Sequence, residues 1–281
     1  MWRGLTGKIA PLAETLGLPS SPRMARPVNP QTRSVGNRGD ILKHSALVEL
    51  AHALTQRGSR IHYIDTHSFL LHSATDEARW QRELDAYVSN PAFARYAHIE
   101  RESLSRTGRY RCSAGLALDV LGAHCVSATL GEAHAATRNE LREQLRSEQL
   151  THANVVEDAV TALRETSVQS PTTLLIHIDP FSLTPELWAS LAPWLDSLCG
   201  PSVQAVLVVY RYTRMAPSAW PPAPRGMLGP LAQIRGGPHE LAAYGSPSLN
   251  ELVCEVCASL RWRVQSVDQG HAPAQRRAGS A

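Results

Sequence analysis

Two short segments of the chain are apolar at almost every position. Residues 173–178 read TLLIHI, and residues 203–210 read VQAVLVVY. Runs this short and this continuously apolar are typical of strands buried on both faces, as in a parallel sheet. They therefore predict an α/β fold with a mainly parallel sheet and helices on both of its faces.

Strand-like and helix-like segments alternate around these two runs. Shorter strands are expected at residues 60–65, 125–130 and 155–157. Apolar residues recur at helical spacing in residues 40–56, and Glu and Arg lie at turn spacing in residues 135–149. Residues 186–198 are also expected to be helical. This alternation is typical of βαβ units, which supports the parallel sheet.

Near the C-terminus the alternation is interrupted. The five prolines of residues 216–230 predict an irregular loop, because proline lacks an N–H donor and fixes its own backbone. A last helix is expected at residues 249–260 and a last strand at 262–267. No internal repeat is found.

The same pattern predicts three parts of the chain. Residues 1–58 are expected to form an N-terminal helical extension whose last part acts as a lid over a ligand. Residues 59–266 are expected to form the α/β domain itself. Residues 267–281 contain few apolar side chains and are expected to be a disordered tail.

The composition argues against several classes of protein. Hydrophobic residues make up 43% and charged residues 19% of the 281 positions, which is unlike a disordered chain. No run of about 18 apolar residues is present, so we expect neither a transmembrane helix nor a membrane partner. Residues 1–19 lack the apolar stretch of a secretory signal, so we expect a cytoplasmic protein.

Charge and cysteine content constrain the partners. The net charge of +3 permits contact with RNA without arguing for it. Five scattered cysteines are interpreted as reduced thiols. Cys254 and Cys257 have the spacing of a zinc-binding pair, but a structural zinc site needs four ligands and no second pair follows. We therefore expect no metal.

Acidic residues follow four successive predicted strands. They are Asp65, Glu132, Asp158 and Asp179. In open α/β sheets, ligands bind beyond the carboxyl ends of the strands, so these carboxylates are expected to meet one ligand. Such a series suits the ribose hydroxyls, the adenine amino group and a reacting amine of an adenosyl ligand. Any one of these Asp residues, taken alone, could instead be the N-cap of the following helix.

A resemblance to a known family is visible along most of the chain. Residues 35–50 (VGNRGDILKHSALVEL) resemble the N-terminal motif of the bacterial 23S rRNA adenine-N6 methyltransferases, which reads roughly GNxADVLKH. Residues 63–67 (YIDTH), 110–113 (YRCS), 132–134 (EAH), 157–159 (EDA) and 178–180 (IDP) resemble later motifs of that family in the same order.

The resemblance implies a Rossmann-like class I methyltransferase fold that binds S-adenosylmethionine (SAM). By position, Lys43, His44 and Ser113 lie near the amino-acid end of SAM. Glu132 holds the ribose, Asp158 the adenine, and Asp179 faces the reacting nitrogen. The other motif residues assigned to SAM binding are Asp65, His67 and Tyr110.

Two motifs depart from the family pattern. The family's glycine-rich DTHAGAG is replaced by DTHSFLL at residues 65–71, and glycines there let the backbone approach a ligand closely. The family's DPPY becomes DPFS at residues 179–182, and Ser182 cannot stack on a base as tyrosine does. Phe181, Tyr210 or Tyr212 can instead face the sulfonium of SAM through a cation–π contact. We therefore place Asp179, Phe181, Ser182 and Tyr210 at the reacting centre.

Three hypotheses follow, and the first is favoured. The protein is a SAM-dependent enzyme for a small nucleophile in specialised metabolism, in the extreme case for the α-amine of SAM itself. That cyclisation gives azetidine-2-carboxylate and 5′-methylthioadenosine. The second hypothesis is methylation of an adenine amine in 23S rRNA, and the third is a non-catalytic protein that only binds SAM. The sequence leaves the oligomeric state open.

Overall fold

The computed structural model describes residues 35–85, 87, 90–167, 172–212, 220–236 and 238–269. All of these described residues belong to one compact unit. The first 34 residues of the expected extension, and the expected tail from residue 270 onward, lie outside the described residues. The division at residue 58 and the lid stay predictions.

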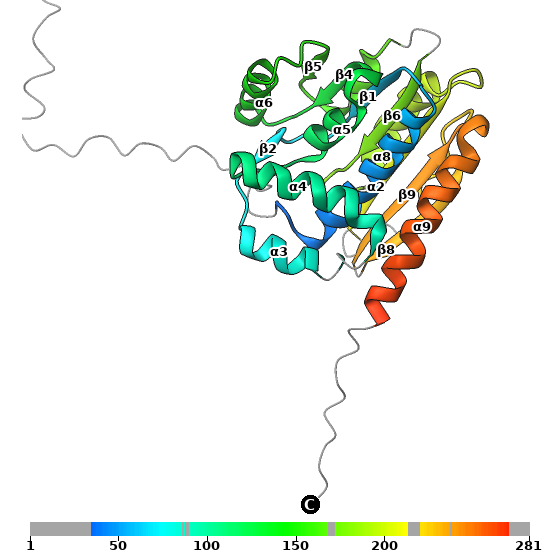
Figure 1. Ribbon diagram of the computed structural model, residues 1–281. Coiled ribbons are helices and arrows are strands. Elements are labelled where there is room, and N and C mark those ends of the chain that lie inside the picture. The colour runs from blue at the N-terminus through cyan, green and yellow to red at the C-terminus, as the bar shows by residue number, and fades with distance from the viewer. Residues whose placement is uncertain are drawn as a thin grey trace, which may run out of the picture. The chain divides into compact units, whose positions relative to one another are not determined.

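A seven-stranded sheet forms the centre of the molecule, in the order β5-β4-β1-β6-β7-β9-β8 (Figure 1). Neighbours among the first five are parallel, and β9 runs antiparallel to both β7 and β8. The strands are β1 (Ile61–Asp65), β4 (Cys125–Gly131), β5 (Ala153–Val156), β6 (Thr173–Ile178), β7 (Ala205–Tyr212), β8 (Leu228–Gly236) and β9 (His239–Gly245). The expected α/β class with a mainly parallel sheet is confirmed.

Side chains alternate between the two faces of the sheet, and each face has its own core. Tyr63, Leu175 and Val208 belong to the first core, whereas Ile64, Ile176 and Leu207 belong to the second. The first is covered by α2 (Arg38–Gln56), α5 (Ser113–Leu121), α6 (Ala135–Ser147) and α9 (Asn250–Gln269). The second is covered by α7 (Ala159–Arg164) and α8 (Pro185–Leu198).

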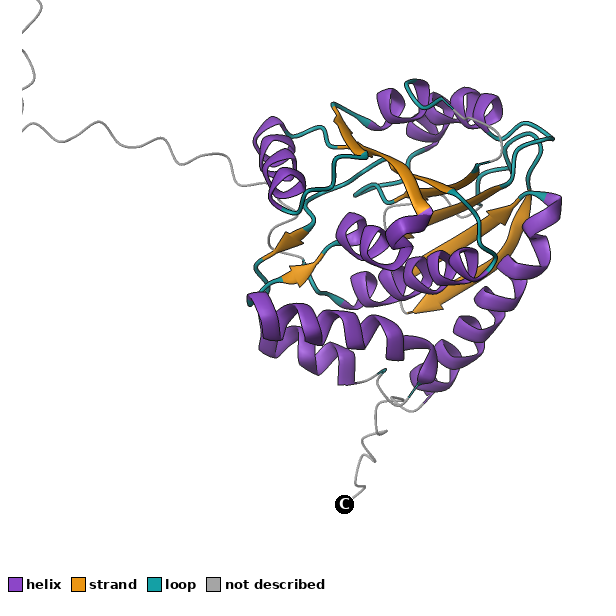
Figure 2. Ribbon diagram, turned by 45° about the horizontal axis from the view of Figure 1, so that its top comes forward, coloured by secondary structure: helices purple, strands orange, loops and turns teal. Residues whose placement is uncertain are grey.

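Smaller elements extend the first layer. The helices α3 (Glu77–Asp85) and α4 (Ala94–Thr107) pack against α2. Figure 2 shows an antiparallel ribbon of β2 (His72–Ser73) and β3 (Tyr110–Arg111) beside the main sheet. In the described part of the chain, three single turns of 3-10 helix are η2 (Pro91–Phe93), η3 (Gly122–His124) and η4 (Pro247–Leu249).

The strand order turns around at β1. From β1 the chain builds outward to β4 and β5 on one side, and then returns to add β6 and β7 on the other. The helices that follow β1 and β6 therefore lie on opposite faces, which opens a crevice at the carboxyl ends of these two strands. Asp65 and Asp179 stand at that edge.

Two expectations for the C-terminal region are wrong. Residues 262–267 continue α9 rather than forming a strand, since no Gly or Pro interrupts the sequence before Gly270. Residues 228–230 belong to β8 rather than to the irregular loop. The sheet tolerates Pro230 because the pairing of β8 with β9 is irregular between Leu228 and Ala232. None of the helices in the described ranges has the length and apolar character needed to cross a bilayer.

The close packing of α5 against the loop after β1 gives a test of the fold. A Cβ on Gly115 would lie 2.2 Å from the carbonyl oxygen of Leu71. Gly115→Ala should therefore lower the free energy of unfolding by about 1–3 kcal/mol in urea denaturation. Gly200→Ala is the control, because a Cβ there meets nothing within 4 Å. Equal stability of the two variants would show that α5 does not approach the loop this closely.

Candidate functional site

A cavity of about 300 Å³ opens at the carboxyl ends of the central strands. Its walls come from the start of α2, the loop after β1, β3, the start of α5, the ends of β6 and β7, and the start of β9. The lining residues are Val35, Asn37, Asp40, Lys43, His44, Phe69, Tyr110, Cys112, Ser113, Asp179, Pro180, Phe181, Tyr210, Tyr212 and His239. Aromatic rings and a few ionisable groups thus share one small space.

The start of α2 fixes the charged side of the cavity. Asn37 caps the helix by accepting from the N–H groups of Gly39 and Asp40. Asp40 Oδ2 accepts in return from the N–H of Asn37 at 3.3 Å, and also from that of Gly36 at 2.7 Å. This reciprocal cap sets the direction of the first turn. As a result, Lys43 reaches across the cavity toward the end of β6.

Lys43 is held between two carboxylates. Its Nζ lies 2.5 Å from Asp179 Oδ2 and 2.8 Å from Asp40 Oδ1. Burial alone would lower the pKa of Lys43, but Asp179 and Asp40 outweigh it and raise the pKa. Burial raises the pKa of Asp179, partly offset by Lys43. One cation between two carboxylates leaves an excess of negative charge when all three are ionised, which favours a cationic ligand.

A chain of hydrogen bonds holds the polar side of the cavity. His44 Nδ1 lies 2.9 Å from the hydroxyl of Tyr110, which lies 2.9 Å from that of Tyr96. Trp80 Nε1 donates to Tyr96 at 3.2 Å. Burial lowers the pKa of His44 to about 3, so its imidazole is neutral at ordinary pH. The chain presents neutral polar groups at this side of the cavity.

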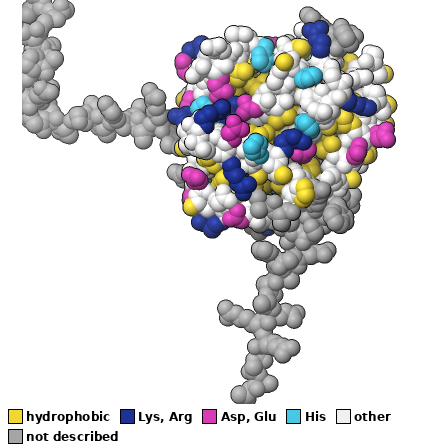
Figure 3. All heavy atoms as spheres, in the orientation of Figure 1, with side chains coloured by type: hydrophobic (Ala, Val, Ile, Leu, Met, Phe, Trp, Pro, Cys, Tyr) yellow, Lys and Arg dark blue, Asp and Glu magenta, His cyan; other side chains and the backbone are white. Residues whose placement is uncertain are grey.

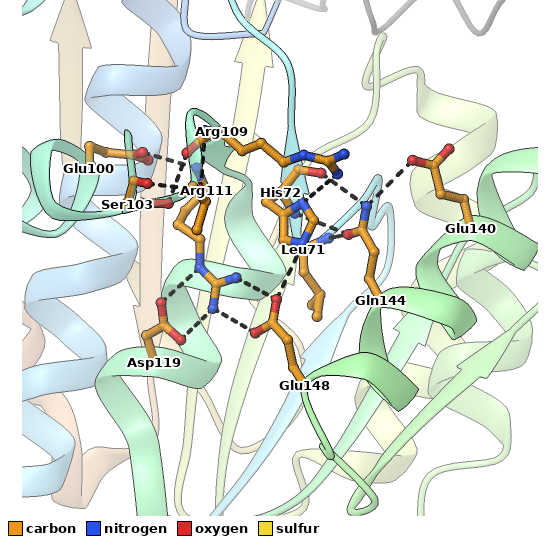
Figure 4. Close-up of polar contacts among 11 residues, drawn as sticks. Leu71, His72, Glu100, Ser103, Arg109, Arg111, Asp119, Glu140, Gln144 and Glu148 are labelled. Carbon is orange, nitrogen blue, oxygen red and sulfur yellow. Dashed lines mark hydrogen bonds and ion pairs between the residues drawn. The ribbon is translucent and has the colours of Figure 1, made fainter. Parts of the chain in front are cut away.

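The position of Tyr110 depends on its neighbour Arg111. Figure 4 shows the Arg111 guanidinium between Asp119 of α5 and Glu148 after α6. The backbone N–H of Arg111 also donates to Glu100 at 3.0 Å. Charge-assisted pairs of this kind are short and directional, so β3 is fixed relative to α5 and α6.

Beneath the cavity lies a buried network around Asp65. Its Oδ2 accepts from Ser113 Oγ at 2.8 Å and from the Tyr63 hydroxyl at 3.0 Å. Its Oδ1 lies 3.4 Å from Nδ1 of His177. Burial works to raise the pKa of Asp65, but His177 and these hydrogen bonds lower it to about 2. Asp65 does not line the cavity, and it instead holds Ser113, which does.

The loop after β1, residues 66–71, is held by hydrogen bonds to the end of β4 and to α6. Ser68 N–H donates to the carbonyl of Gly131 at 2.7 Å, and Leu71 N–H donates to Gln144 Oε1 at 2.8 Å (Figure 4). Phe69 lines the cavity, while Leu70 and Leu71 are buried in the first core. Of these three bulky side chains, therefore, Phe69 is the one that narrows the cavity.

The predicted site residues divide into two groups. Those that the structure brings together on the cavity are Lys43, His44, Tyr110, Ser113, Asp179, Phe181 and Tyr210. Those outside its lining are Asp65, His67, Glu132, Asp158 and Ser182. His67 is largely buried, which lowers its pKa to about 4, and its Nδ1 lies 2.7 Å from Thr66 Oγ1.

Glu132 and Asp158 stand at the neighbouring strand ends. Glu132 follows β4, and one of its oxygens accepts from the N–H of His134 at 2.6 Å. Asp158 follows β5 and is the N-cap of α7, accepting from the N–H of Thr161 at 2.7 Å. The capping role that any single Asp can have is thus present at Asp158.

His239 is a lining residue that the sequence analysis did not single out. It is the first residue of β9, and its Nδ1 lies 2.5 Å from the hydroxyl of Tyr210. Asp40 also lines the cavity and belongs to the N-terminal motif of residues 35–50, which assigns it no role. The motif could therefore have pointed to Asp40. His239 lies shortly after the irregular loop expected at residues 216–230, and no motif or periodicity around it indicates a site.

Two solved structures of bacterial proteins are similar to this chain. Protein LPL1258 from Legionella pneumophila, of family DUF519, is 18% identical over 81% of this chain and 94% of that chain, with a TM-score of 0.51. The Escherichia coli putative methyltransferase yhhF is 14% identical over 80% of this chain and 90% of its own, with a TM-score of 0.41. The chain has a Rossmann-like α/β fold with a mainly parallel sheet, and LPL1258 shares this fold. No protein-family model and no curated protein matches this chain.

The burial of Glu132 predicts a pH-dependent stability. Burial raises the pKa of this carboxyl from 4.5 to about 7, so its ionised form lowers the stability of the folded protein. Glu132→Gln removes that cost. The variant should therefore be more stable than the unaltered protein near pH 8, and the difference should shrink as the pH falls through about 7 toward 4.5.

Urea denaturation across this pH range measures the effect. The control is Glu157→Gln, because the Glu157 side chain is exposed at a nearby strand end. It should show a much smaller change with pH. A Glu132→Gln variant whose stability relative to the unaltered protein is the same at pH 5 and pH 8 would contradict the burial of this carboxylate.

Proposed function

We propose that the protein is a SAM-dependent enzyme that alkylates a nitrogen atom of a small substrate. The observation that carries the proposal is the carboxylate of Asp179, which stands at the end of β6 in a small aromatic cavity at the topological switch point. Ligand sites of open α/β sheets lie at this place. The cavity is near the lower limit for small-molecule sites, which favours a small acceptor over a large one.

The start of α5 suits the carboxylate of SAM. Cys112, the N-cap residue, makes no side-chain hydrogen bond to the helix, and both Cys112 and Ser113 line the cavity. The first N–H groups of a helix attract anions. Ser113 and the neutral His44 add polar groups near this helix start. These residues would hold the amino-acid end of SAM.

The aromatic walls suit the sulfonium. Tyr210 already faces one cation, because Lys43 Nζ lies 5.1 Å from the centroid of its ring. A cation over an aromatic face is stabilised by the charge distribution of the ring. Tyr210, Tyr212, Phe181 and Phe69 would surround the sulfonium, whose neighbouring carbons are the electrophiles that SAM supplies. The excess negative charge of Asp40 and Asp179 around Lys43 would also stabilise the positive sulfonium.

The adenosine half is assigned to Glu132 and Asp158 by their place at the strand ends and by the family resemblance. Glu132 is only 6% exposed, and one of its two oxygens is engaged by His134. The other oxygen would accept from a ribose hydroxyl. Asp158 would accept from the adenine amino group while it still caps α7.

Asp179 would orient the attacking nitrogen. Lys43 binds its Oδ2, and among the described residues no hydrogen bond is made to its Oδ1. Oδ1 would accept an N–H from the nucleophile and aim its lone pair at the electrophilic carbon. Orientation of this kind can supply much of the rate enhancement of a displacement reaction.

Most concretely, the nucleophile is the α-amine of SAM itself. The new bond joins this nitrogen to Cγ, the Cγ–S bond breaks, and its electron pair stays on sulfur. The nitrogen loses a proton, and the products are azetidine-2-carboxylate and 5′-methylthioadenosine. A cavity narrowed by Phe69 favours this reaction, because it needs no space for a second substrate.

A second candidate is methylation of an adenine amine in 23S rRNA. The phenyl ring of Phe181 is 71% exposed beside Asp179, where it could stack on a flipped base. Against it, acidic and basic side chains are interspersed over the face shown in Figure 3 rather than gathered into a basic patch. The aromatic stacking position of the family also holds Ser182.

The experiment that tests the proposal is incubation with SAM alone, followed by mass spectrometry. We expect 5′-methylthioadenosine and a matching amount of azetidine-2-carboxylate, well above the level without protein. Asp179→Asn, which keeps the shape of the side chain but loses its charge, should misorient the nucleophile and reduce product formation at least ~100-fold while SAM affinity changes only a few-fold.

Other outcomes separate the alternatives. If SAM stays intact but methyl groups reach undermethylated rRNA, the second candidate is correct, and RNA binding should weaken steeply with salt. If SAM binds but no acceptor among small amines and rRNA is alkylated, the protein only binds SAM. Full turnover by Asp179→Asn would contradict the role of Asp179.

The assignment of Asp158 gives a separate prediction for binding. Asp158→Ala should weaken SAM binding by ~10- to 100-fold in calorimetry, the usual effect of losing a hydrogen bond to a charged group. Asp76→Ala is a matched control, because Asp76 accepts from the N–H of Arg79 at the start of α3 but does not line the cavity. Both variants lose a helix cap, and only the first should lose affinity.

A further inference from the structure

A second polar couple stands in the cavity wall opposite α5. Tyr210, from β7, and His239, from the first position of β9, present stacked rings whose centroids are 6.0 Å apart. The Tyr210 hydroxyl lies 2.5 Å from Nδ1 of His239. Both residues line the cavity. No part of the proposed function so far uses this contact.

We propose that Tyr210 and His239 form a proton relay that removes the proton from the attacking nitrogen. The proposal rests on the proposed function and adds a division of labour to it. Asp179 orients the nucleophile, and the relay supplies the base. The relay is required most by an aliphatic amine, which is an ammonium ion at neutral pH and has no lone pair until a proton leaves.

Asp179 is poorly suited to be that base. Burial raises the pKa of Asp179, but its Oδ2 is 2.5 Å from Lys43 Nζ, an ammonium that Asp40 also holds in place. A proton arriving on Asp179 would weaken this buried ion pair and leave the charge of Lys43 less compensated. The carboxylate is therefore more useful ionised, as an acceptor of a hydrogen bond.

The Tyr210–His239 couple has the donor and acceptor states that a relay needs. Burial raises the pKa of Tyr210 above its usual range, so Tyr210 keeps its proton. With His239 protonated on Nε2, the Tyr210 hydroxyl donates to Nδ1. Burial lowers the pKa of His239, and nearby Lys43 lowers it further. His239 is thus neutral and can accept a proton at physiological pH.

Charged and titratable groups face His239 from two elements. Arg38 and Lys43 of α2 disfavour the imidazolium, whereas Asp40 of the same helix favours it. From β7, Tyr210 is the hydrogen-bond partner, and the ring of Tyr212 lies 5.3 Å from the imidazole centroid. Asp40 is therefore the group that would stabilise the imidazolium once the proton arrives.

The proton transfer balances without any other reactant. A proton of the substrate ammonium moves to the oxygen of Tyr210 as the hydroxyl proton moves to Nδ1 of His239. The nitrogen gains its lone pair, Tyr210 is restored, and His239 becomes an imidazolium. The imidazolium then returns its proton to solvent after the displacement.

The packing around His239 keeps the couple aligned. A Cβ on Gly39 would lie 2.5 Å from Nδ1 and 2.7 Å from Cε1 of His239, so the imidazole rests directly on the α2 backbone. Gly39 is in the first turn, three residues before Leu42 and four before Lys43. One turn of α2 therefore positions both the ion pair and the relay.

The test compares Tyr210→Phe and His239→Gln with the unaltered full-length protein. Each variant should keep its SAM affinity within ~3-fold and lose turnover by ~10²-fold or more, the usual contribution of general acid–base catalysis. In the unaltered protein, turnover should fall on the acid side as His239 becomes protonated. This acid limb should be absent in His239→Gln. The control is His98→Gln, the same change at an exposed histidine.

A spectroscopic measurement separates a relay from a structural role. Nitrogen NMR should find His239 protonated on Nε2 with Nδ1 as an acceptor, and Tyr210→Phe should shift the Nδ1 signal and the titration of this residue. No shift in Tyr210→Phe would overturn the relay even if turnover falls.

The kinetic outcomes also distinguish the two proposals. An unaltered protein that binds SAM but alkylates no amine overturns the proposed function. An active unaltered protein whose His239→Gln variant keeps the same rate and the same acid limb overturns the relay alone.

Discussion

The ion pair between Lys43 and Asp179 is the contact on which the site depends. It connects the first turns of α2 to the end of β6, two segments that are 136 residues apart in the chain. Both side chains are largely buried, so neither charge would be tolerated there without its partner. The capping box of Asn37 and Asp40 fixes the helix start from which Lys43 reaches the sheet. Helix capping thus positions the charged centre of the cavity.

The rest of the cavity follows from this charged centre and from the closed loop after β1. With Phe69 in the wall and the Ser68 N–H bonded to the end of β4, the space beside Asp179 stays small and is lined in part by aromatic rings. Such a space suits a compact cationic ligand with a carboxylate at one end. The buried Asp65 contributes indirectly, because it fixes Ser113 at the start of α5 rather than meeting a ligand.

Local sequence patterns predicted the core of the fold, because strands buried on both faces have few other interpretations. The strand-end position predicted Asp179, and the family resemblance predicted Lys43 and Ser113; all three line the cavity. Sequence patterns could not show that Glu132 and Asp158 lie outside the cavity lining. That arrangement depends on the tertiary contacts of the loop after β1. His239 was missed because the β8–β9 hairpin has no regular alternation, and pairing across the sheet decides which side chain meets Tyr210.

A crystal structure with bound SAM tests the central claim most directly, namely that this cavity holds the amino-acid end of SAM. The account predicts the carboxylate of SAM at the start of α5 beside Ser113, and the sulfonium within about 6 Å of the Tyr210 ring centroid. The account also predicts that the Lys43–Asp179 ion pair stays intact. SAM bound elsewhere, or a cavity that stays empty at saturating SAM, would contradict it.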